Sequence, residues 1–235
     1  MPDYIILEQH GEALKVPVRR SQKAKRIGIR ITYKSSVELV LPSGVKPEIG
    51  HKFLLSKEHW IRKKLQKAII SSQIPSNIIP ILGKSYNMLC HQADDNSVKL
   101  QHECIEVYSR DNNYHDVLKN FLKGILLQKI IILAAPIITE YKLRYNKIRI
   151  TSNVSKWGSC SSKGNLSFNW RLVFAPEEVL QYVVIHEICH LKEMNHSKNF
   201  WHLVSIIEPD YLLPKLWLRK NGHLLNYHLN AAISL

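Results

Sequence analysis

Three histidines and one glutamate occur within eleven residues, from His186 to His196, in the segment HEICHLKEMNH. If this segment is helical, His186 and His190 are four residues apart and lie on one face, with their Cβ atoms about 5–6 Å apart. Two imidazoles placed in this way can bind one tetrahedral metal ion at about 2.0–2.1 Å. Glu187 lies one step round the helix, where its carboxylate reaches a metal-bound water rather than the metal. This is the HExxH pattern of zinc hydrolases.

The third ligand is expected from the turn that follows. Asn195 suits a left-handed helix end and Ser197 can cap the next helix, so a helix-turn-helix would bring His196 back toward the first two ligands. Glu208 is a more distant alternative, but nothing in its surroundings favours it. His202 is expected at the surface or behind the ligands rather than as a fourth ligand.

Three histidine ligands leave the fourth position of a tetrahedral ion open to water, which marks a catalytic site. Cys189 does not readily close it, because its side chain points about 100° away from that of His190. A bound metal lowers the pKa of its water to about 7, and Glu187 accepts the proton and passes it to the leaving amine. The pattern predicts a zinc hydrolase, and most readily a peptidase. Tyr211 and His202 are both conceivable as the group that stabilises the oxyanion.

Two other interpretations stay open at this point. One is an apo protein in which the histidines are satisfied core residues. The other is a nucleic-acid-binding protein in which zinc only staples the C-terminal half. A staple has no use for a carboxylate at the open position, so Glu187 separates the catalytic interpretation from the structural one.

The elements around the motif support a buried helix. Apolar residues surround the motif, and Pro176 with two following glutamates is typical of a helix start. Upstream, residues 165–174 alternate apolar and polar side chains like a strand, after the Gly- and Ser-rich loop KWGSCSSKG. Asn169 and Arg171 would lie on the polar face of this strand. They face either a groove for an extended substrate or only solvent.

The whole chain is expected to have an α+β fold. Its β-rich N-terminal half contains one long helix over residues 47–70, and a zincin-like C-terminal half follows, with helices, a small sheet and the HExxH helix. The pattern changes at RDNN, so a β-rich region over 1–110 and a metallopeptidase region over 111–235 are predicted. The second region begins with a long helical stretch, residues 114–146, bent near Pro136.

The composition favours a cytoplasmic protein. The chain has 235 residues, of which 45% are hydrophobic, and its four cysteines show no CxxC pair. The N-terminus lacks the pattern of a signal peptide. The longest uncharged apolar run, residues 130–139, is shorter than the roughly 20 residues that span a bilayer.

Positive charge is concentrated near the N-terminus. The net charge is +14, and residues 1–70 contain 15 Lys and Arg against 6 Asp and Glu, a net of +9. Such a region can attract nucleic acid, although a solubilising surface is the simpler explanation, because no recognised nucleic-acid motif accompanies it.

The segments KWGSCSSKGNLSFNWRLVFAP and HEICHLKEMNHSKNFW together resemble the YgjP-like zinc metallopeptidase family, which is related to SprT-like and WLM metalloproteases among the zincins. The resemblance implies that His186, His190 and His196 bind Zn²⁺ and that Glu187 is the general base. The histidine spacing equals that of metzincins, but those enzymes have Gly where this chain has Glu193. Kinship with SprT-like proteases, which cleave proteins attached to DNA, implies a possible DNA-associated role for the basic N-terminal segment.

Overall fold

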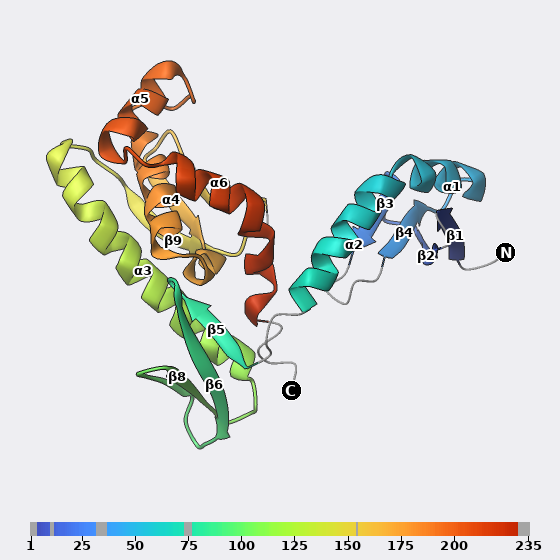
Figure 1. Ribbon diagram of the computed structural model, residues 1–235, viewed down its shortest axis with the longest axis horizontal. Helices are drawn as coiled ribbons and strands as arrows, with labels where there is room; N and C mark the ends of the chain where they lie inside the picture. The colour runs from blue at the N-terminus through green and yellow to red at the C-terminus, as the bar shows by residue number, and fades with distance from the viewer. Residues whose placement is uncertain (1–3, 10–11, 32–36, 73–76, 154, 230–235) are drawn as a thin grey trace. The chain divides into compact units, whose positions relative to one another are not determined.

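The computed structural model describes residues 4–9, 12–31, 37–72, 77–153 and 155–229. The chain divides into two compact units, Met1–Ile74 and Pro75–Leu235 (Figure 1). This division differs from the predicted boundary after residue 110. The difference arises because the four strands before that point pack against the long helix after it, and so belong to the second unit.

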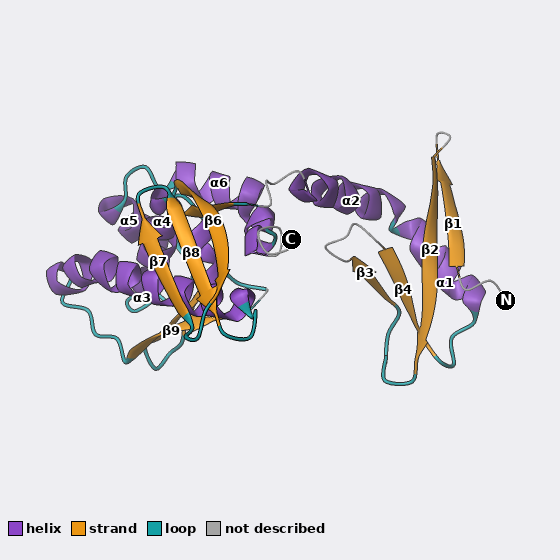
Figure 2. Ribbon diagram, turned by 90° about the horizontal axis from the view of Figure 1, so that it is seen from below, coloured by secondary structure: helices purple, strands orange, loops and turns teal. Residues whose placement is uncertain are grey.

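The first unit is a four-stranded sheet with two helices. Its strands are β1 (Tyr4–Gln9), β2 (Glu12–Ser21), β3 (Gly28–Ile31) and β4 (Val37–Pro42), in the order β1-β2-β4-β3 (Figure 2). The β2–β4 pair is parallel and the other two pairs are antiparallel. The alternating residues of β4 on one face, Val37, Leu39 and Leu41, are buried in a core with residues of both helices.

The helix predicted over residues 47–70 is two helices, α1 (Pro47–Ser56) and α2 (Glu58–Ser72). The break lies at Lys57, whose φ of −111° and ψ of 5° leave the helical region. Leu54 and Ile61 lie on either side of the break, and both are fully buried. Both residues belong to the same core cluster, so the two helices cover one core.

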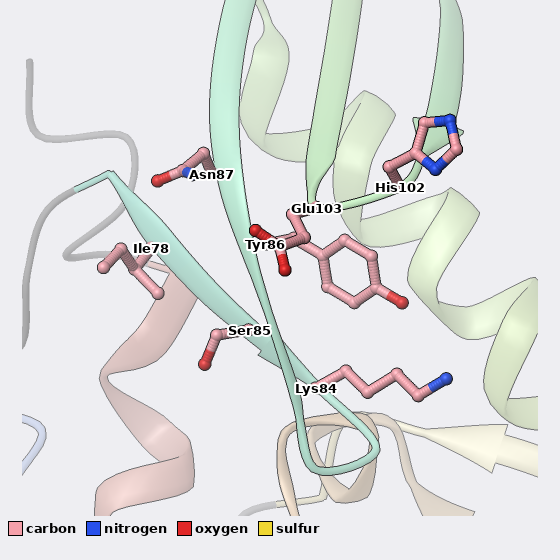
Figure 3. A pocket seen from close by; sticks show the side chains of 7 residues that line it. All are labelled: Ile78, Lys84, Ser85, Tyr86, Asn87, His102 and Glu103. Carbon is pink, nitrogen blue, oxygen red and sulfur yellow. The ribbon is translucent and has the colours of Figure 1, made fainter.

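The second unit begins with another four-stranded sheet. Its strands are β5 (Ile78–Ile81), β6 (Lys84–Gln92), β7 (Ser97–Gln101) and β8 (Cys104–Ser109), in the order β5-β6-β8-β7. Buried residues of this sheet share one core cluster with helix α3 (Tyr114–Glu140). A pocket of about 410 Å³ lies beside the β5–β6 hairpin and the β7–β8 turn (Figure 3).

Helix α3 contributes a row of buried residues to the core of the second unit. Its residues Leu118, Leu122, Leu126 and Ile130 repeat at four-residue spacing and are fully buried in the core. The helix contains Pro136 and ends at Glu140, earlier than the predicted residue 146. Among the described residues, α3 is the one helix whose length and apolar composition would suffice to cross a membrane.

A three-stranded sheet and a set of helices complete the second unit. The strands are β9 (Lys147–Thr151), β10 (Gly158–Cys160) and β11 (Asn165–Asn169), in the order β10-β11-β9. The helical elements are η1 (Trp170–Phe174), α4 (Glu177–Cys189), α5 (Lys198–Ile207), α6 (Leu212–Asn221) and η2 (Gly222–Asn226). Helix α4 packs against both α3 and α6 (Figure 1). Its burial on several sides explains the apolar residues around the HExxH motif.

The strand predicted over residues 165–174 is only half as long. It ends at Asn169, and a 3-10 helix follows. The side chain of Asn169 accepts a hydrogen bond from the backbone N–H of Arg171 at 3.1 Å and so caps that helix. Alternation of apolar residues did not reveal this end, because Trp170 and Leu172 are buried in the 3-10 helix as well.

Candidate metal centre

The three predicted ligands come together at the C-terminal end of α4. His186 is on the helix, His190 is its C-terminal cap, and His196 is in the loop before α5. One nitrogen of each ring lies within 4.8 Å of the other two. The Nε2 atoms of His186 and His196 are 2.9 Å apart. The predicted grouping is thus present in the structure, and among the described residues it is the one group of this kind.

The turn after α4 brings His196 back to the helix. The backbone N–H groups of Lys192 and Glu193 both donate to the carbonyl of Cys189, so the chain winds tightly past the helix end. Ser197 then caps α5, its hydroxyl accepting from the N–H of Phe200 at 3.4 Å, as the sequence predicts. Asn195 is not left-handed, contrary to the sequence prediction. The winding of residues 191–193 supplies the reversal instead.

The turn also orients His190. Its Nδ1 lies 2.9 Å from the backbone carbonyl of Glu193. A hydrogen bond to a carbonyl requires a proton on Nδ1, so Nε2 keeps its lone pair free for a metal. His186 has no such support: its Nδ1 is buried and has no hydrogen-bond partner among the described residues.

Packing holds the rings where hydrogen bonds do not. Phe200, fully buried on α5, stacks on His190 with ring centroids 4.5 Å apart and meets His186 and His196 edge-on at 4.9 and 4.8 Å. Trp201 stacks on His196 at 5.7 Å from the other side. Both aromatic residues follow directly from the predicted helix SKNFWHLVSII, but their contact with the ligands becomes visible only in three dimensions.

The three side chains suit a divalent metal ion. Burial, together with the neighbouring histidines and Lys215, lowers the pKa of His186 to about 3. Burial also lowers the pKa of His196, as do His190 and Lys215. Both rings are therefore neutral at pH 7, which is the form that binds a metal. Tetrahedral zinc ligands stand roughly 3.3 Å apart, so the two Nε2 atoms need to separate by only about 0.4 Å.

Glu187 lies beside the ligands and is almost completely buried, with 5% of its surface exposed. Burial raises the pKa of Glu187 to about 7, although the charge of Lys156 acts in the opposite direction. Its neighbour is the backbone of β10 at Gly158. A Cβ at position 158 would lie 2.5 Å from Oε1 of Glu187 and 2.6 Å from its Cγ. Only glycine leaves room for the carboxylate there.

Gly158 is therefore a site residue that the motif did not reveal. It belongs to the loop KWGSCSSKG, whose glycine content was visible in the sequence. The approach of β10 to α4 was not visible, because residues 158 and 187 are far apart along the chain.

Asn169 does not face a groove, so the substrate-groove alternative left by the sequence is excluded for this residue. It is 2% exposed, and its side-chain amide donates to the backbone carbonyls of Asn153 and Lys156. It thereby holds the loop that leads into Gly158. Arg171 is partly buried, with its guanidinium over the Trp170 ring at 4.9 Å from the centroid. Asn169 thus supports the loop before Gly158 and does not line a substrate groove.

The other residues considered for the site are not part of this histidine group. Cys189 is fully buried, and burial raises the pKa of its thiol to about 12. Glu208 accepts a hydrogen bond from the side-chain amide of Gln181. His202 is exposed on α5, and Tyr211 stacks on Trp201 at 5.5 Å. Within the part of the chain that the structure describes, the metal group is limited to the three predicted histidines.

Three imidazoles around one position, with a buried carboxylate on the same helix as two of them, are typical of the centre of a metal-dependent hydrolase. The model of the family described as YgjP-like, metallopeptidase domain, matches residues 25–221. The chain belongs to this YgjP-like family, which confirms the resemblance drawn from the sequence.

Two further proteins are similar to parts of the chain. The UTP pyrophosphatase of Escherichia coli (strain K12) is 35% identical over 86 residues, covering 31% of this chain and 52% of the relative. The chain thus spans about half the length of that relative. The crystal structure of the metallopeptidase zymogen of Pyrococcus abyssi abylysin is similar over 43% of this chain and 94% of its own, with 24% identity and a TM-score of 0.33.

Proposed function

We propose that this chain is a zinc-dependent hydrolase in which His186, His190 and His196 bind the metal and Glu187 is the general base. The observation that carries the proposal is the buried carboxylate of Glu187, held against Gly158 beside the three imidazoles. A structural metal site is normally closed by four protein ligands and needs no carboxylate at its edge.

The donor set favours zinc. Three imidazole nitrogens with an open fourth position are typical of catalytic zinc sites, whereas calcium and magnesium prefer oxygen ligands. When bound, zinc would lower the pKa of its water and polarise the bond that is cleaved.

Glu187 supplies the proton transfer. A carboxylate is an effective base when its pKa lies near the working pH, and burial raises the pKa of Glu187 to about 7. Gly158 of β10 restricts where the Glu187 carboxylate can lie. From this position Glu187 accepts a proton from the attacking water and returns it to the leaving group.

A peptide is the first candidate substrate. Among the described strands, β10 pairs with β11 alone and so lies at the edge of its sheet, where it contacts α4. An extended peptide can pair with the free edge of such a strand and place its carbonyl at the metal. This arrangement supports the peptidase function that the sequence predicts.

A nucleoside triphosphate is the second candidate, because the Escherichia coli relative is named as a UTP pyrophosphatase. The same metal and base would serve, since metal-activated water also attacks phosphorus. Two lysines near the centre support this candidate: the charge of Lys156 acts on Glu187, and that of Lys215 acts on His186.

The test compares the native protein with Glu187→Gln on two substrates, a mixture of unmodified peptides and UTP. Glu187→Gln is expected to keep one zinc per chain and to lose at least 100-fold in rate, as general bases contribute about 10²–10⁴-fold. Glu178→Gln, an exposed glutamate on the same helix, is the matched control and should retain full rate. Hydrolysis of either substrate at native rate by Glu187→Gln would refute the proposal.

A further inference from the structure

Lys215 lies against an aromatic cradle, formed by Trp201 and Tyr211, that packs on the metal ligand His196. Its Nζ is 3.6 Å from the ring centroid of Trp201 and 5.7 Å from that of Tyr211. These two rings stack on each other, and Trp201 also stacks on His196. The cradle thus connects the ammonium group of α6 to a metal ligand through a single ring.

The charge of Lys215 has no counterion in the part of the chain that the structure describes. None of the ion pairs there includes Lys215, and the nearby Glu208 is hydrogen-bonded to Gln181. An aromatic face stabilises an ammonium group without neutralising it. Lys215 is half-buried and held in place, so its positive charge remains available to a ligand.

The field of this charge reaches the metal ligands. After burial and the neighbouring histidines, Lys215 is a further cause that lowers the pKa values of His186 and His196. A cation near a metal centre opposes the binding of a metal ion, whereas it attracts a bound group of negative charge.

We propose that Lys215 is a specificity-determining residue that binds an anionic phosphate oxygen of the substrate beside the metal centre. The inference rests on the proposed hydrolase function and extends it to the recognition of the substrate. The neutral carbonyl of an internal peptide bond gains little from a full positive charge, whereas a phosphate gains a charge-assisted hydrogen bond. Lys156, whose charge reaches Glu187, adds to the same attraction.

Pyrophosphate binding tests this role without turnover. Zinc-loaded Glu187→Gln is titrated with inorganic pyrophosphate by calorimetry, alone and combined with Lys215→Gln, Lys215→Arg or Lys220→Gln. Loss of one charge-assisted hydrogen bond corresponds to about 10- to 150-fold in affinity. We expect a loss of this size for Lys215→Gln, and recovery to within about threefold for Lys215→Arg, which can also stack on Trp201.

Lys220→Gln removes the same charge from an exposed position of the same helix and should change the affinity less than twofold. Zinc content is measured on every variant. The proposal is overturned if Lys215→Gln binds pyrophosphate as tightly as its parent, if the parent binds none, or if the weaker binding accompanies loss of zinc. It is also overturned if Lys215→Gln leaves the binding of pyrophosphate unchanged and weakens only the binding of peptides with a free C-terminal carboxylate.

The outcome is independent of the proposed catalytic role of Glu187. If Glu187→Gln retains activity, the general-base proposal fails, but the comparison of the lysine variants still stands, because equilibrium binding of pyrophosphate requires no proton transfer. If Glu187→Gln is inactive and Lys215→Gln has no effect, only the phosphate-recognition proposal fails.

Discussion

The contact between Gly158 and Glu187 predicts a large effect from a single methyl group. In Gly158→Ala the new Cβ would lie 2.5 Å from Oε1 of Glu187, where ordinary contacts begin at 3.4 Å. The carboxylate would therefore have to move by roughly 0.9 Å. A misplacement of about 1 Å in a reacting group can cost about 100-fold in rate, or about 2.7 kcal/mol in the activation free energy.

The assay measures kcat/KM on whichever substrate the native protein cleaves, with zinc content and thermal unfolding for each variant. Gly158→Ala should keep its zinc, because the three atoms nearest to the added Cβ all belong to Glu187 and none to an imidazole. Gly124→Ala in α3 is the control, since nothing lies within 4 Å of its added Cβ. A rate for Gly158→Ala within twofold of the native value would refute the argument that this glycine positions the base.

Three other predictions concern the support of the site and the first unit. Asn169→Ala should lower the free energy of unfolding by about 1–3 kcal/mol, measured by urea denaturation, because two backbone carbonyls and an N–H lose their partner. In the metal-free protein, the raised pKa of Glu187 should make stability fall as pH rises from about 4.5 to about 7. Relative to Glu187→Gln, the fall should reach about 3 kcal/mol, and equal pH profiles would contradict it. We also propose that the basic first unit binds nucleic acid. Its affinity for DNA should then fall steeply as the salt concentration rises, and should be lower in the double variant Lys63→Gln/Lys64→Gln. Binding that does not depend on salt would argue against this proposal.

Much of the metal centre could be predicted from the sequence, because its ligands lie within eleven consecutive residues and their spacing determines how they are arranged. The four-residue spacing of His186 and His190 determines a shared helix face, and Ser197 marks the start of the next helix. The return of His196 was predicted correctly, although the turn uses residues 191–193 rather than a left-handed Asn195.

The parts that escaped prediction depend on contacts between distant segments. Gly158 meets Glu187 because β10 packs on α4, and Lys215 of α6 lies over the ring of Trp201 of α5. Asn169 belongs to an alternating segment that predicts an outward side chain, but backbone carbonyls of the preceding loop draw its amide inward. Neither periodicity nor spacing contains this information.

The division of the chain shows the same limit. The change from strand to helix pattern after residue 110 is a change of secondary structure, while the units divide at residue 74. Ile79 and Ile105 of the second sheet pack in one cluster with Leu118 of α3, so strands and helix share a core. Periodicity predicts the elements, but the packing of their faces determines which elements belong together.

We propose that His186, His190 and His196 together hold one catalytic zinc ion. Elemental analysis of the purified chain measures this most directly, with His196→Ala as the variant and His202→Ala, an exposed histidine of α5, as the matched control. We predict one zinc per chain in the native protein and in His202→Ala, and loss of zinc together with activity in His196→Ala. Full zinc occupancy in His196→Ala, or native activity in a zinc-free protein, would contradict the account.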